Sequence, residues 1–248
     1  VRFLALLLLF PAAGAIAQDE ADEVAVSFED IVWQCPEDFS GQTLNIFNWS
    51  TYIGETTVDD FSRLCNVNVN YDVYESNESM IARLRQGNPG YDLVFPSDYA
   101  VAVMLRDELL LELDFANIPN YANIADEFKG LDYDPEERYS APYLWGSFGV
   151  LYNTERVPEG IKSWNDVFNH DGPVAWIADV RAMFMIGLHL QGFDPNSLDP
   201  DEIEATKNFL LERSGNVVTF AADDGQTLLE RGEVDIALDY NGDAFQLI

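Results

Sequence analysis

Residues 44–53 read LNIFNWSTYI and place a strand directly before an aromatic turn. Apolar and aromatic residues without a breaker predict a strand over Leu44–Trp49. The chain then brings a hydroxyl group and a second large aromatic side chain, from Ser50 and Tyr52, into the turn that follows. Large aromatic side chains usually lie in protein cores, so their position at a strand end suggests contact with a ligand.

The stretches that follow repeat a strand–helix rhythm. Residues 66–74 alternate apolar with polar side chains, which is typical of a half-buried strand, and apolar residues recur at helical spacing between the strands. The predicted strands are 44–49, 66–74, 91–95, 173–178, 216–220 and 234–238. The predicted helices are 55–65, 79–86, 164–168, 181–190, 200–213 and 225–231, and helical structure is also expected after residues 96–99 up to about residue 111. This rhythm predicts an α/β fold with parallel-type sheets flanked by helices.

The length of 248 residues allows one large domain or two lobes, and a hydrophobic content of 48% supports a well-buried core. Residues 1–17 end in Ala15-Ile16-Ala17 after a short apolar run, which is typical of a secretory signal peptide cleaved after Ala17. We expect an acidic leader at 18–40, a first lobe at 41–142, and a crossing strand with a second lobe at 143–248. The chain stops just after a predicted helix begins, so the second lobe is expected to be incomplete.

The charge balance is strongly acidic, with 44 Asp and Glu against 13 Lys and Arg and a net charge of −31. Such a surface repels nucleic acid and anionic membranes, so neither is expected as a partner. Two explanations stay open: the acid is a solvated surface of the kind found in proteins adapted to high salt, or it attracts cationic ligands.

The two cysteines are Cys35 and Cys65. In an exported protein an even number permits one disulfide, which would tie the segment before the first strand to the end of the first helix. Two separate buried thiols are the alternative. The spacing is not that of a metal site, and we expect no metal and no cofactor.

Polar and aromatic groups gather where the predicted strands end. In open parallel sheets, ligands bind beyond the carboxyl ends of the strands. The residues at four such ends are Trp49, Ser50, Thr51 and Tyr52; Ser97, Asp98 and Tyr99; Asp179; and Asp239, Tyr240 and Asp243. Simpler roles compete: Ser97 and Asp179 could cap helices, Asp243 could serve a turn, and Trp49 could belong to the core.

Aromatic faces and carboxylates together suit an organic ammonium ligand. Aromatic rings attract cations, and carboxylates accept charge-assisted hydrogen bonds from N–H groups. Aliphatic primary amines are charged at neutral pH, and the methylene stretches of a linear polyamine can lie between rings.

Catalytic patterns are weak by comparison. His170 lies in an Asn-His-Asp-Gly turn, and His189 within an apolar helix is expected to be packed rather than catalytic. The chain lacks the nucleophile elbow, zinc and phosphate-loop motifs. A secreted carboxylate-dependent hydrolase stays as a remote alternative, because such an enzyme uses a pair of carboxylates. With 44 acidic residues, such pairs are expected by chance and are not specific evidence for an enzyme.

Several motifs together resemble the spermidine/putrescine-binding proteins of bacterial ABC transporters. They are, in order, NIFNWSTYI, YDVYESNESMIARL, YDLVFPSDY, APYLWG, SWNDVF and DYNGDAF. The resemblance covers about residues 43–248 and implies a two-lobed periplasmic binding protein fold of the second type. It also implies a monomer that captures putrescine or spermidine in an interlobe cleft in the periplasm and delivers it to an ABC permease, with no catalysis.

By this resemblance, ligand contacts are expected from eight residues: Trp49, Ser50, Tyr52, Ser97, Tyr99, Asp179, Tyr240 and Asp243. Two positions depart from the family pattern, because Thr51 and Ala182 stand where acids are common. Asp98 and Asp239 could supply the missing carboxylates if their side chains face the ligand. A binding protein for another small cationic solute or an amino-acid derivative is therefore the main alternative.

Overall fold

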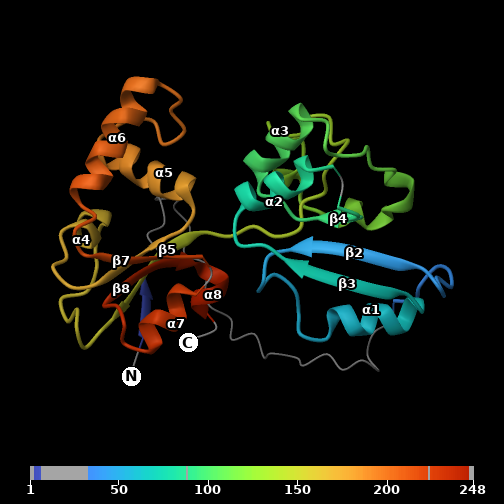
Figure 1. Ribbon diagram of the computed structural model, residues 1–248, viewed down its shortest axis with the longest axis horizontal. Coiled ribbons are helices and arrows are strands. Elements are labelled where there is room, and N and C mark those ends of the chain that lie inside the picture. Colours follow the sequence, from blue (N-terminus) through green and yellow to red (C-terminus); the bar gives the residue numbers. More distant parts are fainter. Residues whose placement is uncertain (1–2, 7–32, 88, 223, 246–248) are drawn as a thin grey trace. The chain divides into compact units, whose positions relative to one another are not determined.

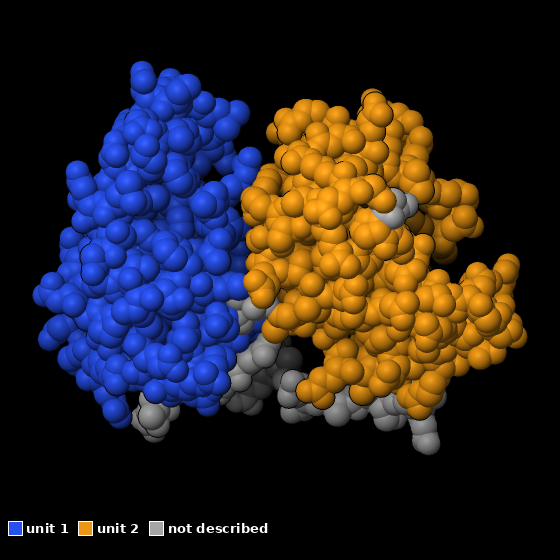
Figure 2. Space-filling view, in the orientation of Figure 1, with its two compact units in different colours: residues 1–13, 146–248 blue, residues 14–145 orange. Residues whose placement is uncertain are grey.

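The computed structural model describes residues 3–6, 33–87, 89–222 and 224–245. The chain divides into two compact units, with residues 14–145 in unit 2 and residues 1–13 and 146–248 in unit 1 (Figure 2). Most of the predicted signal peptide and leader, residues 7–32, lies outside the described residues. The predicted domain boundaries and the cleavage after Ala17 stay predictions.

Unit 2 contains a small parallel sheet in the order β3-β2-β4 (Figure 1). Its strands are β2 (Thr43–Asn48), β3 (Asn68–Val73) and β4 (Leu93–Val94), and its helices are α1 (Thr57–Cys65), α2 (Asn77–Arg85) and α3 (Asp98–Arg106). Each helix follows one strand, as the predicted rhythm requires. Because the strands are parallel, the turns after β2, β3 and β4 lie at the same edge of the sheet.

The core of unit 2 lies between this sheet and helices α2 and α3. Phe47 of β2 contributes to a buried cluster with Met80 of α2 and Met104 of α3. Successive strand residues face opposite sides, so the neighbouring Ile46 is buried away from that cluster. The partly buried rings of Trp49 and Tyr99 pack against the cluster, which places part of the candidate site on the core of the unit.

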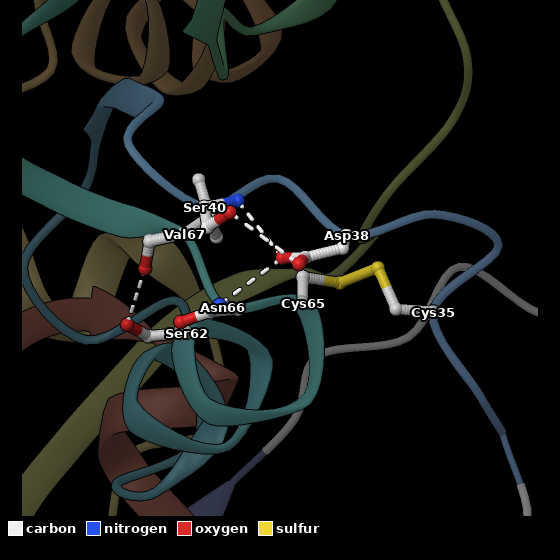
Figure 3. Close-up of a disulfide and its surroundings, with 7 residues drawn as sticks. All are labelled: Cys35, Asp38, Ser40, Ser62, Cys65, Asn66 and Val67. Atoms are coloured by element: carbon white, nitrogen blue, oxygen red, sulfur yellow. Dashed lines mark hydrogen bonds between the residues drawn. A yellow bond between two sulfur atoms is a disulfide. The ribbon is translucent and has the colours of Figure 1, made fainter.

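A disulfide joins Cys35 to Cys65 across 30 positions of sequence, with the sulfur atoms 2.09 Å apart (Figure 3). The same corner is held by Asp38, whose carboxylate accepts hydrogen bonds from the Ser40 backbone at 3.0 Å and the Asn66 amide at 3.1 Å. Asn66 ends helix α1 in the left-handed conformation with φ of 51°. The segment before β2 is thereby tied to the carboxyl end of α1.

The stretch 114–138 of unit 2 contains the short 3-10 helices η2 (Phe115–Asn117), η3 (Pro119–Asn123) and η4 (Asp126–Phe128). The buried carboxylate of Asp134 organises its end, because it accepts hydrogen bonds from the backbone of Tyr139 at 2.9 Å and of Ser140 at 2.9 Å. Burial acts to raise the pKa of Asp134, but the hydrogen bonds from Tyr139, Arg138 and Ser140 outweigh it and hold the pKa below its ordinary value.

Asp134→Asn is expected to lower the free energy of unfolding by about 1–3 kcal/mol at pH 7, because an amide N–H₂ would face backbone donors. A depressed pKa in the folded state contributes stability above the unfolded pKa of about 3.9 and loses it as the pH falls through the folded value. The difference from wild type should therefore shrink below about pH 4. Denaturant unfolding from pH 7 to 3 measures this, with exposed Asp132→Asn as the matched control. Equal effects of both variants would contradict it.

Unit 1 contains a five-stranded sheet in the order β1-β5-β8-β6-β7. Its strands are β1 (Phe3–Leu6), β5 (Phe148–Asn153), β6 (Val174–Ile177), β7 (Val217–Ala221) and β8 (Ile236–Tyr240). Strands β6, β7 and β8 are parallel as predicted, whereas β5 runs antiparallel to β8 and β1 antiparallel to β5. A strand can join a sheet antiparallel to its neighbour without a crossover helix. The alternation of predicted strands and helices therefore did not reveal the direction of β5.

Helices cover both faces of this sheet (Figure 1). They are α4 (Trp164–Phe168), α5 (Val180–Leu190) and α6 (Pro200–Glu212) on one face, and α7 (Gly225–Glu230) and α8 (Asn241–Phe245) on the other. Strand β8 feeds both cores in alternation, with Ile236 and Leu238 facing α5 and Ala237 facing α7. Among the helices of the described residues, none is long and apolar enough to cross a membrane.

Candidate functional site

The turn after β2 holds the aromatic residues predicted from LNIFNWSTYI. Trp49 is half-buried, and its indole N–H donates to the carbonyl oxygen of Phe95 at 2.9 Å. Its ring lies 4.6 Å from the ring of Tyr74 and 5.9 Å from that of Tyr52, measured between centroids. Trp49 therefore packs against the core of unit 2 and is the first residue of the turn after β2. Ser50 and Thr51 are exposed beside it.

Tyr143 joins the same aromatic group, although the sequence-based site did not include it. Its hydroxyl donates to the carbonyl oxygen of Tyr52 at 2.7 Å, and its ring meets Phe95 edge-on with centroids 4.8 Å apart. The side chain is still 51% exposed. The available signal was the aromatic pair in APYLWG, a motif that was used for the family resemblance and not as a source of ligand contacts.

Ser97 and Tyr99 lie at the start of α3 and are both held by α2. The amide of Asn77 donates to the Ser97 hydroxyl at 2.9 Å and accepts from the Ser97 backbone N–H at 3.0 Å. The Tyr99 hydroxyl donates to the Glu78 carboxylate at 3.1 Å. Ser97 occupies the N-cap position of α3 without a side-chain capping bond, so capping is not what its hydroxyl does. The neighbouring Asp98 is exposed and accepts from the backbone of Tyr99.

Asp179 and Tyr240 form the corresponding pair of unit 1. One carboxylate oxygen of Asp179 caps α5 by accepting from the Ala182 backbone at 2.9 Å. The other accepts from the Tyr240 hydroxyl at 3.0 Å. The capping role considered for Asp179 is therefore real, and it coexists with a bond to a second predicted site residue.

Asp239 and Asp243 are placed differently from Tyr240. Strand alternation turns Asp239 to the α7 face, where it is 1% exposed and accepts from the Gln226 backbone N–H at 2.9 Å. Asp243 is buried on α8. Ala182, at the position where the family resemblance led us to expect an acid, belongs to the buried cluster beneath α5. Of the two substitutes considered for the missing carboxylates, Asp98 is exposed and Asp239 serves the fold.

Burial raises the pKa values of two phenols in the aromatic group. Burial raises the pKa of the Tyr74 hydroxyl far above its ordinary value, and its proton is donated to the carbonyl oxygen of Phe95. Burial likewise raises the pKa of Tyr143. A phenol of ordinary pKa, about 10, is already uncharged at neutral pH, so both phenols act through their rings and their dipoles.

The two histidines of the chain are His170 and His189. His170 contacts the Asp235 carboxylate at 3.1 Å. The expectation that His189 is packed is wrong, because its side chain is exposed on the solvent face of α5. Among the described residues, no three His, Cys, Asp or Glu side chains cluster so that they could hold a metal ion. A cavity of about 590 Å³ in unit 2 lies between the end of α3 and residues 134–139, away from the predicted site residues.

The chain is similar in sequence to a known protein family and to several named proteins. Residues 56–248 match the family described as bacterial extracellular solute-binding protein. The spermidine/putrescine-binding periplasmic protein of Escherichia coli (strain K12) is 33% identical over 207 residues, covering 82% of this chain and 60% of that protein. The putrescine-binding periplasmic protein SpuD of Pseudomonas aeruginosa is 30% identical over 220 residues, covering 83% and 60%.

Solved structures agree with the sequence comparisons. The Tp0655 (TpPotD) lipoprotein of Treponema pallidum has a TM-score of 0.75 at 30% identity, covering 83% of this chain and 66% of that chain. These likenesses confirm the predicted α/β fold class. The chain spans about 60% of the length of the curated relatives it matches.

Proposed function

This chain belongs to the bacterial extracellular solute-binding protein family, and we propose that it captures a polyamine such as putrescine or spermidine in the periplasm for an ABC permease. Its role in this proposal is binding and release, without a chemical step. The related proteins named above carry polyamines in their names, and the side chains of this chain support the same ligand class.

The observation that carries the proposal is the direction of the hydrogen bonds at the candidate residues. The only N–H of the Trp49 indole and the only O–H groups of Tyr99 and Tyr240 are all donated to acceptors of the protein. These side chains can then offer a ligand aromatic faces and oxygen lone pairs, but no proton. In each unit, residues that offer acceptors and ring faces favour a ligand that brings the donors and the positive charge.

A polyamine has those properties. Its amines are protonated at neutral pH and donate N–H bonds to carboxylates and phenol oxygens. An ammonium group over an aromatic face gains about 0.5–2 kcal/mol. The net charge of −31 adds a long-range attraction for cations that salt weakens.

Titration calorimetry tests the proposal. Putrescine, spermidine and spermine are compared with N-acetylputrescine and a panel of amino acids, in low and in moderate salt. We expect one-to-one binding of at least one polyamine, weaker binding in higher salt, and a marked loss on acetylation, because acetylation removes one charge. Binding of no polyamine in low salt would overturn the proposal.

One second candidate has a specific observation in its favour. Thr51 and the buried Ala182 offer no carboxylate at positions where the family resemblance led us to expect an acid, which favours a ligand with fewer amines or an amino-acid derivative. The amino-acid panel decides between the two: tight binding of a member of that panel with weak polyamine binding would select the second candidate.

A further inference from the structure

Two consecutive residues at the start of α2 hold two residues at the start of α3. Asn77 bonds Ser97 through both ends of its amide, and Glu78 accepts the hydroxyl proton of Tyr99 at 3.1 Å. Asn77 is 1% exposed, so the first pair is structural. Glu78 is exposed, so its role is not explained by burial or by packing.

The chemistry of the second pair sets the direction of its hydrogen bond. A carboxylate at neutral pH has acceptors only, so the hydrogen between the two oxygens comes from Tyr99. A phenol has one hydrogen. With that hydrogen given to Glu78, the Tyr99 oxygen can meet any further group only as an acceptor.

Unit 1 contains the same arrangement independently. The Tyr240 hydroxyl donates to Asp179 at 3.0 Å, and Asp179 is itself held by the N–H of Ala182 at 2.9 Å. Each unit therefore has a predicted ligand-binding tyrosine whose proton is held by a carboxylate. In both cases the tyrosine comes from the predicted ligand-binding residues.

We propose that Glu78 is a specificity-determining residue: it holds the Tyr99 hydroxyl proton, makes Tyr99 an acceptor, and so favours ligands that present an ammonium group. This inference rests on the proposed function and names a residue that it did not use. The Glu78 carboxylate also places a negative charge next to the Tyr99 hydroxyl. In the same unit, Thr51 carries no charge at a position where the resemblance led us to expect an acid. Charge-assisted hydrogen bonds of this kind are stronger than neutral ones.

The simpler explanation is that Glu78 only balances the dipole at the start of α2, where acids are common. In that role Glu78 would contribute to the stability of the fold, and the effect of replacing it would not depend on whether Tyr99 is present. The two explanations therefore differ in whether Glu78 and Tyr99 act on the ligand together.

The experiment compares Glu78→Gln, Tyr99→Phe and the double variant in calorimetric titrations with putrescine and N-acetylputrescine. Exposed Glu75→Gln is the matched control, since it removes the same charge from the same segment. We expect Glu78→Gln to weaken putrescine binding about tenfold, Glu75→Gln by less than about twofold, and the double variant to bind about as Tyr99→Phe does. Glu78→Gln should also narrow the preference for putrescine over N-acetylputrescine, because Tyr99 could then donate to the acetyl oxygen.

A measurement without ligand tests the hydrogen bond itself. In protein labelled with ¹³C at tyrosine Cζ, the signal that disappears in Tyr99→Phe should shift in Glu78→Gln and stay in place in Glu75→Gln. If wild type binds putrescine but Glu78→Gln binds within twofold of it, or if the effects of Glu78 and Tyr99 simply add, Glu78 has no role in specificity and the proposed function stands. If wild type binds no polyamine, the proposed function fails and this inference fails with it.

Discussion

Replacement of both Cys35 and Cys65 by serine is expected to lower the free energy of unfolding of unit 2 by about 3–4 kcal/mol. The bond closes a loop between positions separated by 30 in sequence, and the constraint mainly reduces the entropy of the unfolded chain. It also holds the segment in which the Phe39 backbone N–H donates to the Cys65 carbonyl oxygen at 3.0 Å. A domain is typically stable by only 5–15 kcal/mol, so this loss is a large fraction of the total.

Guanidinium unfolding of wild type and of the double variant, each with and without a thiol reductant, measures the effect. Reductant should destabilise wild type to the level of the double variant and leave the variant unchanged. Single Cys→Ser variants are less suitable, because each leaves one reactive thiol. An unfolding midpoint that responds neither to reductant nor to the substitutions would show that the bond contributes nothing to stability.

Trp49→Ala is expected to raise the dissociation constant for a bound polyamine by about thirtyfold, which corresponds to one desolvated cation–π contact of about 2 kcal/mol. The structure predicts a second effect. Because the indole packs against Tyr74 and donates to Phe95, the same variant should also lose stability, by about 2 kcal/mol. Affinity and stability must therefore be measured together.

Trp49→Phe separates the two roles of the side chain. It keeps an aromatic face and removes the N–H bond to Phe95, so affinity should fall by less than about fivefold. Trp33→Ala is the control: Trp33 lies in the same unit, stacked on Phe61, and outside the candidate site. If Trp49→Ala lowers stability and leaves affinity unchanged, Trp49 is a core residue and the proposed contact is wrong.

Much of the fold was predictable because its cause is local. Apolar residues with a period of two or near 3.6 marked β3, α5 and α6 to within about two residues of their observed ends. Successive side chains of β8 point to opposite faces of the sheet. Once the face of one β8 residue is known, Asp239 and Tyr240 are therefore expected on opposite faces. The direction of β5 was not predictable from its own residues, because a strand has the same pattern in parallel and antiparallel pairs.

The candidate site was predictable in its residue types and less so in its contacts. Strand ends indicated Ser97, Tyr99 and Asp179, but not that the first two are held by Asn77 and Glu78. Nor did the sequence indicate that Tyr143 would bond Tyr52, which is 91 positions away. Such contacts depend on which helix lies beside which, and local patterns contain no information on it.

The sequence by itself determined the α/β class, the positions of most of its helices and strands, and the aromatic and acidic residues at the strand ends, because periodicity and composition act over a few neighbouring residues. The tertiary structure alone decided which oxygen receives the proton of each tyrosine. Packing brings Glu78 to Tyr99 and Asp179 to Tyr240, and a hydroxyl with a single hydrogen then takes its direction from the acceptor that packing has placed beside it.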